Sequence, residues 1–392
     1  MAVITPYANV DIATTARILG VTHQHLSHSS ANHARAAYNN IYETGVRHFA
    51  ISRYRPSLIT YPFDYENDRF IYVANPFGET EPVEELVEDY AVMIDIEDDV
   101  VGCPNAEHVY PLLWTDGGWQ KMNYVHINGL GSFYQSCLTP NPDYDSTNIG
   151  LRVPYEHAIR AILAELQFSD GGGVIINHPT WTYNSQSLGL DVQCFTCDCL
   201  DYDARVLGTD ILEGGHQERL AYSTYNADKI LKTGRRCWLF GQGDWNQTRG
   251  RNELLIPAGL TREETEHEVL KAYRKGRFFA RWANTALTVT AVGVSDGIFS
   301  ITTEHADGIK VYVDGVETDH AGNSATVELA EDATYVRAMA YIERDDDPDW
   351  SYDENDTYKD LVFTNPIILN PKTYNYSPAY MKPASASSIL WR

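Results

Sequence analysis

Short apolar runs that stop at polar side chains recur along the chain, and this pattern predicts buried strands whose ends carry chemistry. Ile18-Leu19-Gly20-Val21 is followed by His23 and His25, and Val174-Ile175-Ile176 by Asn177 and His178. Four to eight apolar residues bounded by turn-forming residues are typical of a strand covered on both faces. The stretches Asp210–Gly215 and Cys237–Trp245 repeat the arrangement, with Glu213 after the apolar residues of the first and Asp244 after those of the second.

Two stretches carry a helical pattern between such runs. Ala31–Glu43 is rich in good helix formers and stops before Gly45, and in Tyr155–Phe168 the apolar residues recur at helical spacing. The order strand, helix, strand between Ile18 and Ser52 is the pattern of a parallel β-α-β unit. We therefore predict an α/β fold for this part of the chain.

The pattern changes from Leu287 onward. Segments such as Leu287–Val292, Ile309–Val313 and Tyr335–Ile342 alternate apolar and polar residues, and no helical periodicity separates them. Short strands joined by Gly and Asp turns are typical of a β-sandwich. We predict three parts: an α/β domain over residues 1–284, a small all-β sandwich (Ig-like) domain over 285–372 and a C-terminal tail over 373–392.

Composition narrows the classes of partner. The formal net charge of −24 over 392 residues disfavours nonspecific binding to nucleic acid and to anionic membranes. Six cysteines in a chain of this length do not form a disulfide framework. The start resembles no signal peptide and no apolar run reaches membrane-spanning length, so we expect a cytoplasmic protein without membrane contact.

Histidines and carboxylates at the strand ends suit a metal site. In a strand, side chains two residues apart share a face, so His23 and His25 can reach one ion. Imidazole and carboxylate ligands bind borderline divalent ions such as zinc, manganese or iron. The candidates exceed what one tetrahedral ion needs, which indicates two ions bridged by a carboxylate. The predicted ligands are His23, His25, Glu107, His126, His178 and Asp244.

Five short motifs in this order resemble the PHP (polymerase and histidinol phosphatase) superfamily of metal-dependent phosphoesterases. They are His23-Gln24-His25, Asn105-Ala106-Glu107, His126–Gly131, Asn177-His178-Pro179 and Gly243-Asp244. The resemblance extends to Ala272–Phe279 and to Phe363–Ile367 in the two-domain members. It implies a distorted (β/α)7 TIM-like barrel followed by the all-β domain.

The resemblance also implies how the ligands pair. One ion is expected at His23, His25, Glu107 and Asp244, and a second at Glu107, His126 and His178. Ser52-Arg53-Tyr54 stands where the family carries Thr-Asp-His, and Asn246 replaces a further histidine. The missing ligands predict two ions and not three, with His28 and His33 as the spare histidines near a third position.

The expected activity is hydrolysis of a small phosphate mono- or diester by a metal-bridging hydroxide. Arg53 is predicted either to bind the substrate anion or to form a structural ion pair. His28, Tyr54 and His216 are the candidate general acids. Two alternatives stay open at this stage. The first is a metallohydrolase of a carbamate, amide or ester, and the second is a catalytically attenuated binding protein.

The cluster of cysteines has a simpler interpretation than a metal site. Cys194, Cys197 and Cys199 have no second ligand pair at zinc-finger spacing, which favours free thiols in a loop over a structural zinc. The substrate is expected to be a small molecule, and the loops at 61–77, 134–154 and 180–203 would select it. The sequence does not indicate an oligomeric state.

Overall fold

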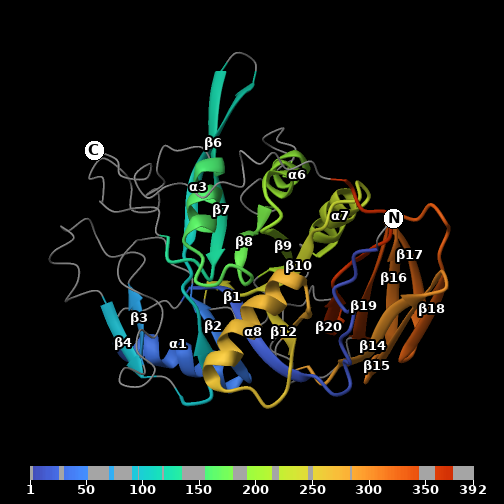
Figure 1. Cartoon of the computed structure of the whole chain (residues 1–392), viewed down its shortest axis with the longest axis horizontal. Helices are drawn as coiled ribbons and strands as arrows, with labels where there is room; N and C mark the ends of the chain where they lie inside the picture. Colours follow the sequence, from blue (N-terminus) through green and yellow to red (C-terminus); the bar gives the residue numbers. More distant parts are fainter. Residues whose placement is uncertain are drawn as a thin grey trace.

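The computed structural model describes residues 3–25, 31–51, 70–74, 91–95, 97–116, 119–134, 155–179, 192–213, 220–245, 250–282, 285–343 and 358–373 (Figure 1). The helices of these ranges are α1 (Ala31–Glu43), α3 (Tyr155–Ala164), α6 (Val192–Tyr202), α7 (Leu220–Leu231) and α8 (Arg262–Lys275). More than twice as many described residues lie in strands as in helices.

In the described ranges, thirteen strands precede residue 285. They are β1 (Ala16–His25), β2 (Val46–Ile51), β3 (Phe70–Ala74), β4 (Ala91–Asp95), β5 (Val101–Gly102), β6 (Glu107–Asp116), β7 (Trp119–Leu130), β8 (Gly173–Ile176), β9 (Val206–Glu213), β10 (Trp238–Gln242), β11 (Asp244–Trp245), β12 (Gly250–Ile256) and β13 (Phe278–Trp282). The later strands are β14 (Thr288–Ser295), β15 (Ile298–Glu304), β16 (Gly308–Val313), β17 (Val316–Ala321), β18 (Ser324–Glu328), β19 (Tyr335–Glu343), β20 (Tyr358–Thr364) and β21 (Ile367–Ile368).

Two large sheets organise the described part of the molecule. An 11-stranded sheet runs in the order β17-β16-β19-β20-β13-β12-β1-β2-β5, with β11 beside β1 and β21 beside β19. A 5-stranded sheet runs in the order β10-β9-β8-β7-β6. Smaller sheets join β14, β15 and β18, and β3 with β4. Figure 1 shows β1 at the centre, next to the strands of the second sheet.

The predicted (β/α)7 TIM-like barrel is wrong. The fold is predominantly β, and the described strands form open sheets that do not close on themselves. A barrel of that kind needs parallel neighbours separated by helices. Here β6 and β7 pair antiparallel over their whole length, and β12 lies antiparallel to both β1 and β13. The parallel pairing that we predicted from polar residues at strand ends is present in some pairs, such as β1–β2 and β8–β9.

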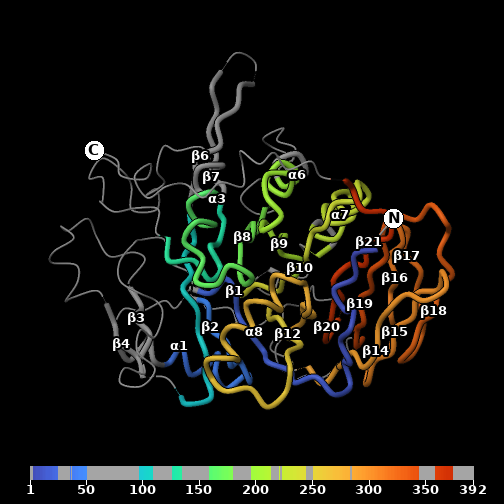
Figure 2. Tube along the Cα trace, viewed as in Figure 1, coloured from blue at the N-terminus to red at the C-terminus, as the bar shows by residue number. Residues whose placement is uncertain are grey.

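The C-terminal strands continue the large sheet. β20 pairs antiparallel with β13, so residues on both sides of the predicted boundary at 284–285 share one hydrogen-bonded sheet. One apolar core joins Tyr7, Leu255 and Phe279 to Phe299 and Val336. Figure 2 shows the first residues of the chain running beside the C-terminal strands, where Ile4 and Ile368 exchange two backbone hydrogen bonds of 2.9 Å. The division into domains stays a prediction.

Local patterns located several elements closely. The helix expected at Ala31–Glu43 is α1 with the same bounds, which confirms that prediction. The loop predicted for 180–203 is wrong in part, because Val192–Tyr202 forms helix α6 with Cys197 and Cys199 buried on it. Both cysteines belong to an apolar core cluster, and this burial outweighs the loop-like composition of the stretch.

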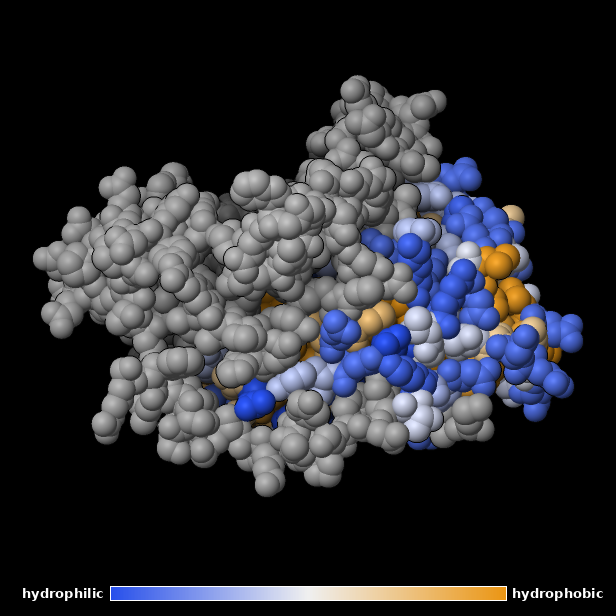
Figure 3. Space-filling view, turned by 90° about the horizontal axis from the view of Figure 1, so that it is seen from above, coloured by the Kyte–Doolittle hydropathy of each residue, from blue (hydrophilic) through white to orange (hydrophobic). Residues whose placement is uncertain are grey.

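The surface of the described residues is mixed. In the view of Figure 3 hydrophilic atoms cover most of the coloured face, and apolar atoms gather at the end formed by the C-terminal strands. Within the described ranges, Ile298 and Val316 of those strands are 42% and 66% exposed. None of the described helices combines the length and the apolar composition that a membrane crossing requires.

His48 on β2 is a fully buried imidazole, and its environment predicts a pH-dependent stability. Burial lowers its pKa from 6.5 to about 3. The unfolded chain binds a proton at this imidazole more readily than the folded chain does. His48 therefore does not lower the unfolding free energy above about pH 6.5, and the unfolding free energy decreases as the pH falls from there toward 3. Each pH unit in that window costs up to about 1.4 kcal/mol of unfolding free energy.

We expect His48→Leu to flatten this decline. Denaturant unfolding of wild type and His48→Leu between pH 7 and 4 measures their unfolding free energies. The unfolding free energy of the wild type should fall more steeply with decreasing pH than that of His48→Leu. His320→Gln, on the edge strand β17, is the matched control and should retain the wild-type decline. A difference between wild type and His48→Leu that stays constant with pH would refute the neutral buried state.

Candidate metal centre

Three buried side chains from separate strands meet between the two large sheets. His23 lies near the end of β1, Glu107 begins β6, and His178 follows β8 by two residues. Their side chains are fully buried, and all three offer ligand atoms within 4.8 Å of one another. Because imidazole nitrogens and carboxylate oxygens are ligands of zinc and similar ions, this cluster could hold a metal ion.

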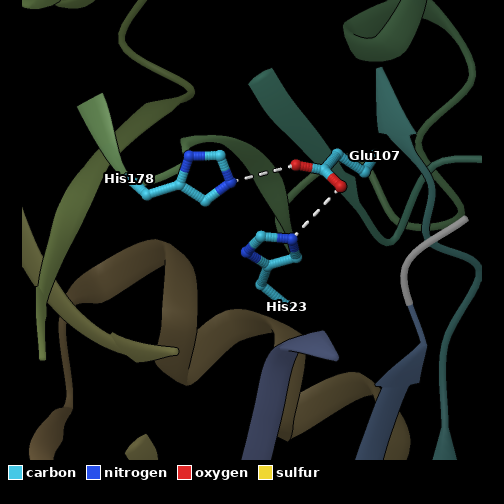
Figure 4. A group of neighbouring side chains, drawn as sticks. All are labelled: His23, Glu107 and His178. Carbon is cyan, nitrogen blue, oxygen red and sulfur yellow. Dashed lines mark ion pairs between the residues drawn. The ribbon is translucent and has the colours of Figure 1, made fainter. Parts of the chain in front are cut away.

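The two oxygens of Glu107 face different histidines, as Figure 4 shows. Oε2 lies 3.2 Å from Nε2 of His23, and Oε1 lies 3.3 Å from Nε2 of His178. His126 on β7 adds a third imidazole, with Nδ1 2.8 Å from Oε1. The carboxylate therefore stands between His23 on one side and the pair His126 and His178 on the other.

The charge state of Glu107 follows from these neighbours. Burial by itself raises the pKa of this carboxyl group. The nearby His23 and His126 and the hydrogen bonds from His126 and His178 outweigh burial, and they hold the pKa of Glu107 well below its usual range. Glu107 is therefore a carboxylate at neutral pH, the form in which it can bind a cation.

Strand pairing sets the positions of these groups. In the β6–β7 ladder Glu107 is paired with Asn128, which places His126 two residues away on the same face of β7. The Asn177 N–H donates to the carbonyl of His126 at 2.9 Å, and this bond brings the segment after β8 against β7. The backbone of His178 has a φ of +26°, which is rare for a residue with a Cβ atom.

Buried amide side chains surround the cluster. Oε1 of Gln242, at the end of β10, lies 3.3 Å from Nδ1 of His23. Asn177 donates to Oε1 of Glu107 at 3.1 Å, and Asn105 donates to the carbonyls of Thr22 and Ala50. Gln242 was not among the site residues predicted from the sequence, although it comes directly after a buried apolar run. Its position at a strand end was the signal that could have found it.

The other predicted site residues fall into two groups. Arg53, Tyr54, His28 and His216 lie outside the described residues, so their predicted roles stay predictions. For His25 and Asp244 the structure describes the backbone alone. Parallel pairing of β1 with β11 places Asp244 opposite Gln24 and Trp245 opposite His25. The backbone of Asp244 therefore lies next to the strand that carries His23.

The unusual backbone of His178 leads to a prediction about stability. A residue with a Cβ atom held at positive φ costs of the order of 1 kcal/mol, whereas glycine adopts such angles freely. We expect the unfolding free energy of His178→Gly, measured by denaturant unfolding, to exceed that of His178→Ala by about 1 kcal/mol, although both variants lose the imidazole. An alanine variant at least as stable as the glycine variant would contradict the strain.

Comparison of the chain with protein-family models, with curated proteins and with solved structures finds no match. The resemblance to the PHP superfamily is therefore wrong as an assignment, because no family model supports it and the fold is mainly β, with no TIM-like barrel. The short motifs did locate ligand-type residues that meet in space. Metal sites need only a few side chains at strand ends, and unrelated folds can supply these.

Proposed function

We propose that this protein is a metal-dependent hydrolase and that its substrate is a phosphate ester. One observation carries the proposal: a buried carboxylate, Glu107, directs its two oxygens toward separate histidines. A carboxylate in that arrangement is suited to bridge two cations, as in many hydrolytic two-metal centres. The low pKa of Glu107 supports its role as an ion ligand and argues against a role as general acid.

The proposed ions divide the ligands according to this geometry. Oε2 of Glu107 and Nε2 of His23 would hold the first ion, with His25 and Asp244 as the further predicted ligands. Oε1 of Glu107, Nδ1 of His126 and Nε2 of His178 would hold the second. The distances of 2.8–3.3 Å between the ligand atoms fit ions bound at about 2.0–2.2 Å from each atom.

The chain's own residues shape how a substrate would reach the centre. The side chain of His126 is 14% exposed, whereas those of His23, Glu107 and His178 are fully buried. We therefore place the entry for substrate on the side of His126. Bound divalent ions would supply Lewis acidity and lower the pKa of water to about 7, which provides a nucleophile at neutral pH.

The choice of a phosphate ester rests on the positive charge that two bound divalent ions would supply. With a net charge of −24 the protein repels anions at long range, and two divalent ions would reverse the local field where the substrate binds. Two cations at a suitable spacing also stabilise the charge that develops on attacking and leaving oxygens in phosphoryl transfer. Arg53 stays a predicted contact of the phosphate, and His28, Tyr54 and His216 stay the predicted proton donors.

The same acidic charge favours one alternative substrate class. A neutral carbamate, amide or ester would approach without the repulsion that a phosphate meets. Metal-activated water attacks a carbonyl carbon as well as phosphorus, so the centre would serve either substrate.

Metal content tests the centre directly. We expect the wild-type protein reconstituted with zinc or manganese to hold about two equivalents by elemental analysis. His126→Ala should hold about one, and Glu107→Gln, which keeps the shape of the side chain but loses its charge, less than one. His267→Ala is the control, because that ring pairs with Asp170 at the surface. Wild-type protein that binds no metal would refute the proposal.

Hydrolysis of nitrophenyl substrates then tests the activity. We expect metal-dependent release of nitrophenol from the phosphate mono- or diester, and a loss of about a hundredfold or more in kcat/KM for Glu107→Gln. The circular dichroism spectrum of Glu107→Gln should match that of the wild type, which serves as the control for folding. Turnover of the acetate ester but of neither phosphate would favour the alternative substrate class, and turnover that persists without metal would contradict both.

A further inference from the structure

We propose that Gln242 and Asn177 are positioning residues for the metal ligands. Through a one-way series of side-chain amide hydrogen bonds they hold a proton on Nδ1 of His23, so that Nε2, which faces Glu107, is the nitrogen that gives up its own proton when an ion binds. This inference rests on the proposed metal-binding function, which it extends from the ligands to the groups that orient them. It concerns atoms of the chain itself, so it can be tested without measuring turnover.

Two successive residues, Gln242 and Gly243, hold His23 in place. The side-chain oxygen of Gln242 lies 3.3 Å from Nδ1 of His23. The backbone N–H of Gly243 donates to the carbonyl of His23 at 3.1 Å. Gln242 is fully buried, so water does not compete for its amide. Side chain and backbone of His23 are therefore both attached to the end of β10.

Asn128, at the far end of this series of side-chain hydrogen bonds, determines their direction. Nδ2 of Asn128 donates to the carbonyl of Thr22, and a carbonyl can only accept. The oxygen of Asn128 accepts from Nδ2 of Asn177 at 2.9 Å. The same Nδ2 donates to Oε1 of Glu107 at 3.1 Å, and a carboxylate also only accepts. Asn177 therefore has its nitrogen toward Glu107 and Asn128.

The oxygen of Asn177 consequently faces Gln242. It accepts a hydrogen bond of 3.1 Å from Nε2 of Gln242. This bond leaves the oxygen of Gln242 as the atom that faces His23, and an oxygen next to Nδ1 requires a proton on Nδ1. Reversing any one amide would set two acceptors or two donors against each other, which is costly in a buried site.

The consequence for the ligands is geometric. With Nδ1 occupied by Gln242, Nε2 of His23 is the nitrogen directed at Oε2 of Glu107, 3.2 Å away. A ligating histidine commonly donates its other ring N–H to an oxygen, and loss of that partner weakens metal binding by about 10–100-fold. Because Asn177 also contacts Glu107, one amide chain orients ligands that come from β1 and β6.

Metal affinity of the full-length protein tests the role. We expect Gln242→Met, which keeps the volume but loses the acceptor, to weaken zinc binding by about 10–100-fold in a chelator competition. Gln242→Glu retains an oxygen for Nδ1–H and should recover at least part of this affinity. Gln167→Met removes a half-buried amide that contacts Glu266 and should bind zinc like the wild type. Equal affinity in Gln242→Met and Gln167→Met would overturn the proposal.

NMR of the histidine rings provides the second measurement. In ¹⁵N-labelled wild-type protein we expect a slowly exchanging Nδ1–H signal from His23, assigned by its absence in His23→Gln. The signal should disappear or shift in Gln242→Met and remain in Gln167→Met. A His23 ring that carries its proton on Nε2 alone would overturn the proposed chain.

The two measurements separate the two proposals. If the wild-type protein shows the Nδ1–H signal but binds neither zinc nor manganese, the metal-binding function fails and the positioning role fails with it. If the protein binds metal but the signal is absent, the metal site stands and the role of Gln242 and Asn177 is refuted.

Discussion

A carboxylate buried among imidazoles is the interaction on which the centre of this molecule depends. An isolated ionised carboxylate is costly to bury, and the cost is met only by partners close at hand. Glu107 has such partners in His23, His126 and His178, which lie on β1, on β7 and just after β8. The large sheet supplies the first, and the five-stranded sheet supplies the others. The same contacts that keep Glu107 ionised thus join the two sheets.

Buried amides make this arrangement rigid. Each amide has one acceptor and one donor end, so a chain of them that stops at a backbone carbonyl has a single direction. The chain from Thr22 through Asn128 and Asn177 to Gln242 returns to His23, one residue from where it starts. Side chains locked by such bonds can present ligand atoms with the precision that metal binding needs. The unusual φ of His178 is a further sign that the surroundings, and not local preference, hold the ligands.

The acidic charge of the chain and the histidine-rich centre have opposite effects on an anionic substrate. A net charge of −24 repels phosphate at a distance, whereas divalent ions at Glu107 would attract it over a short range. Because salt screens the long-range part more strongly than the short-range part, the balance between the two depends on ionic strength. The mainly β architecture does not decide the chemistry, since the site and not the fold carries it.

The sequence by itself determined the local elements and the kinds of ligand. Helix-forming residues before Gly45 specified α1 to the residue, and apolar runs followed by His23 and His178 marked two strand ends that contribute to the centre. These features depend on neighbours along the chain, so pattern and propensity suffice to find them. The choice of Glu107 and His126 as ligand candidates also came from residue type and position.

Only the tertiary structure decided how these elements combine. Antiparallel pairing of β6 with β7, and of β12 with β1, produced open sheets in place of the predicted barrel. Whether two strands run parallel depends on contacts between residues far apart in sequence, and an apolar run is compatible with either direction. The separate directions of the two oxygens of Glu107 and the approach of Gln242 to His23 likewise arise only once distant strands are brought together. His23 and Gln242 are 219 positions apart in the sequence, so only the folded chain brings them into contact.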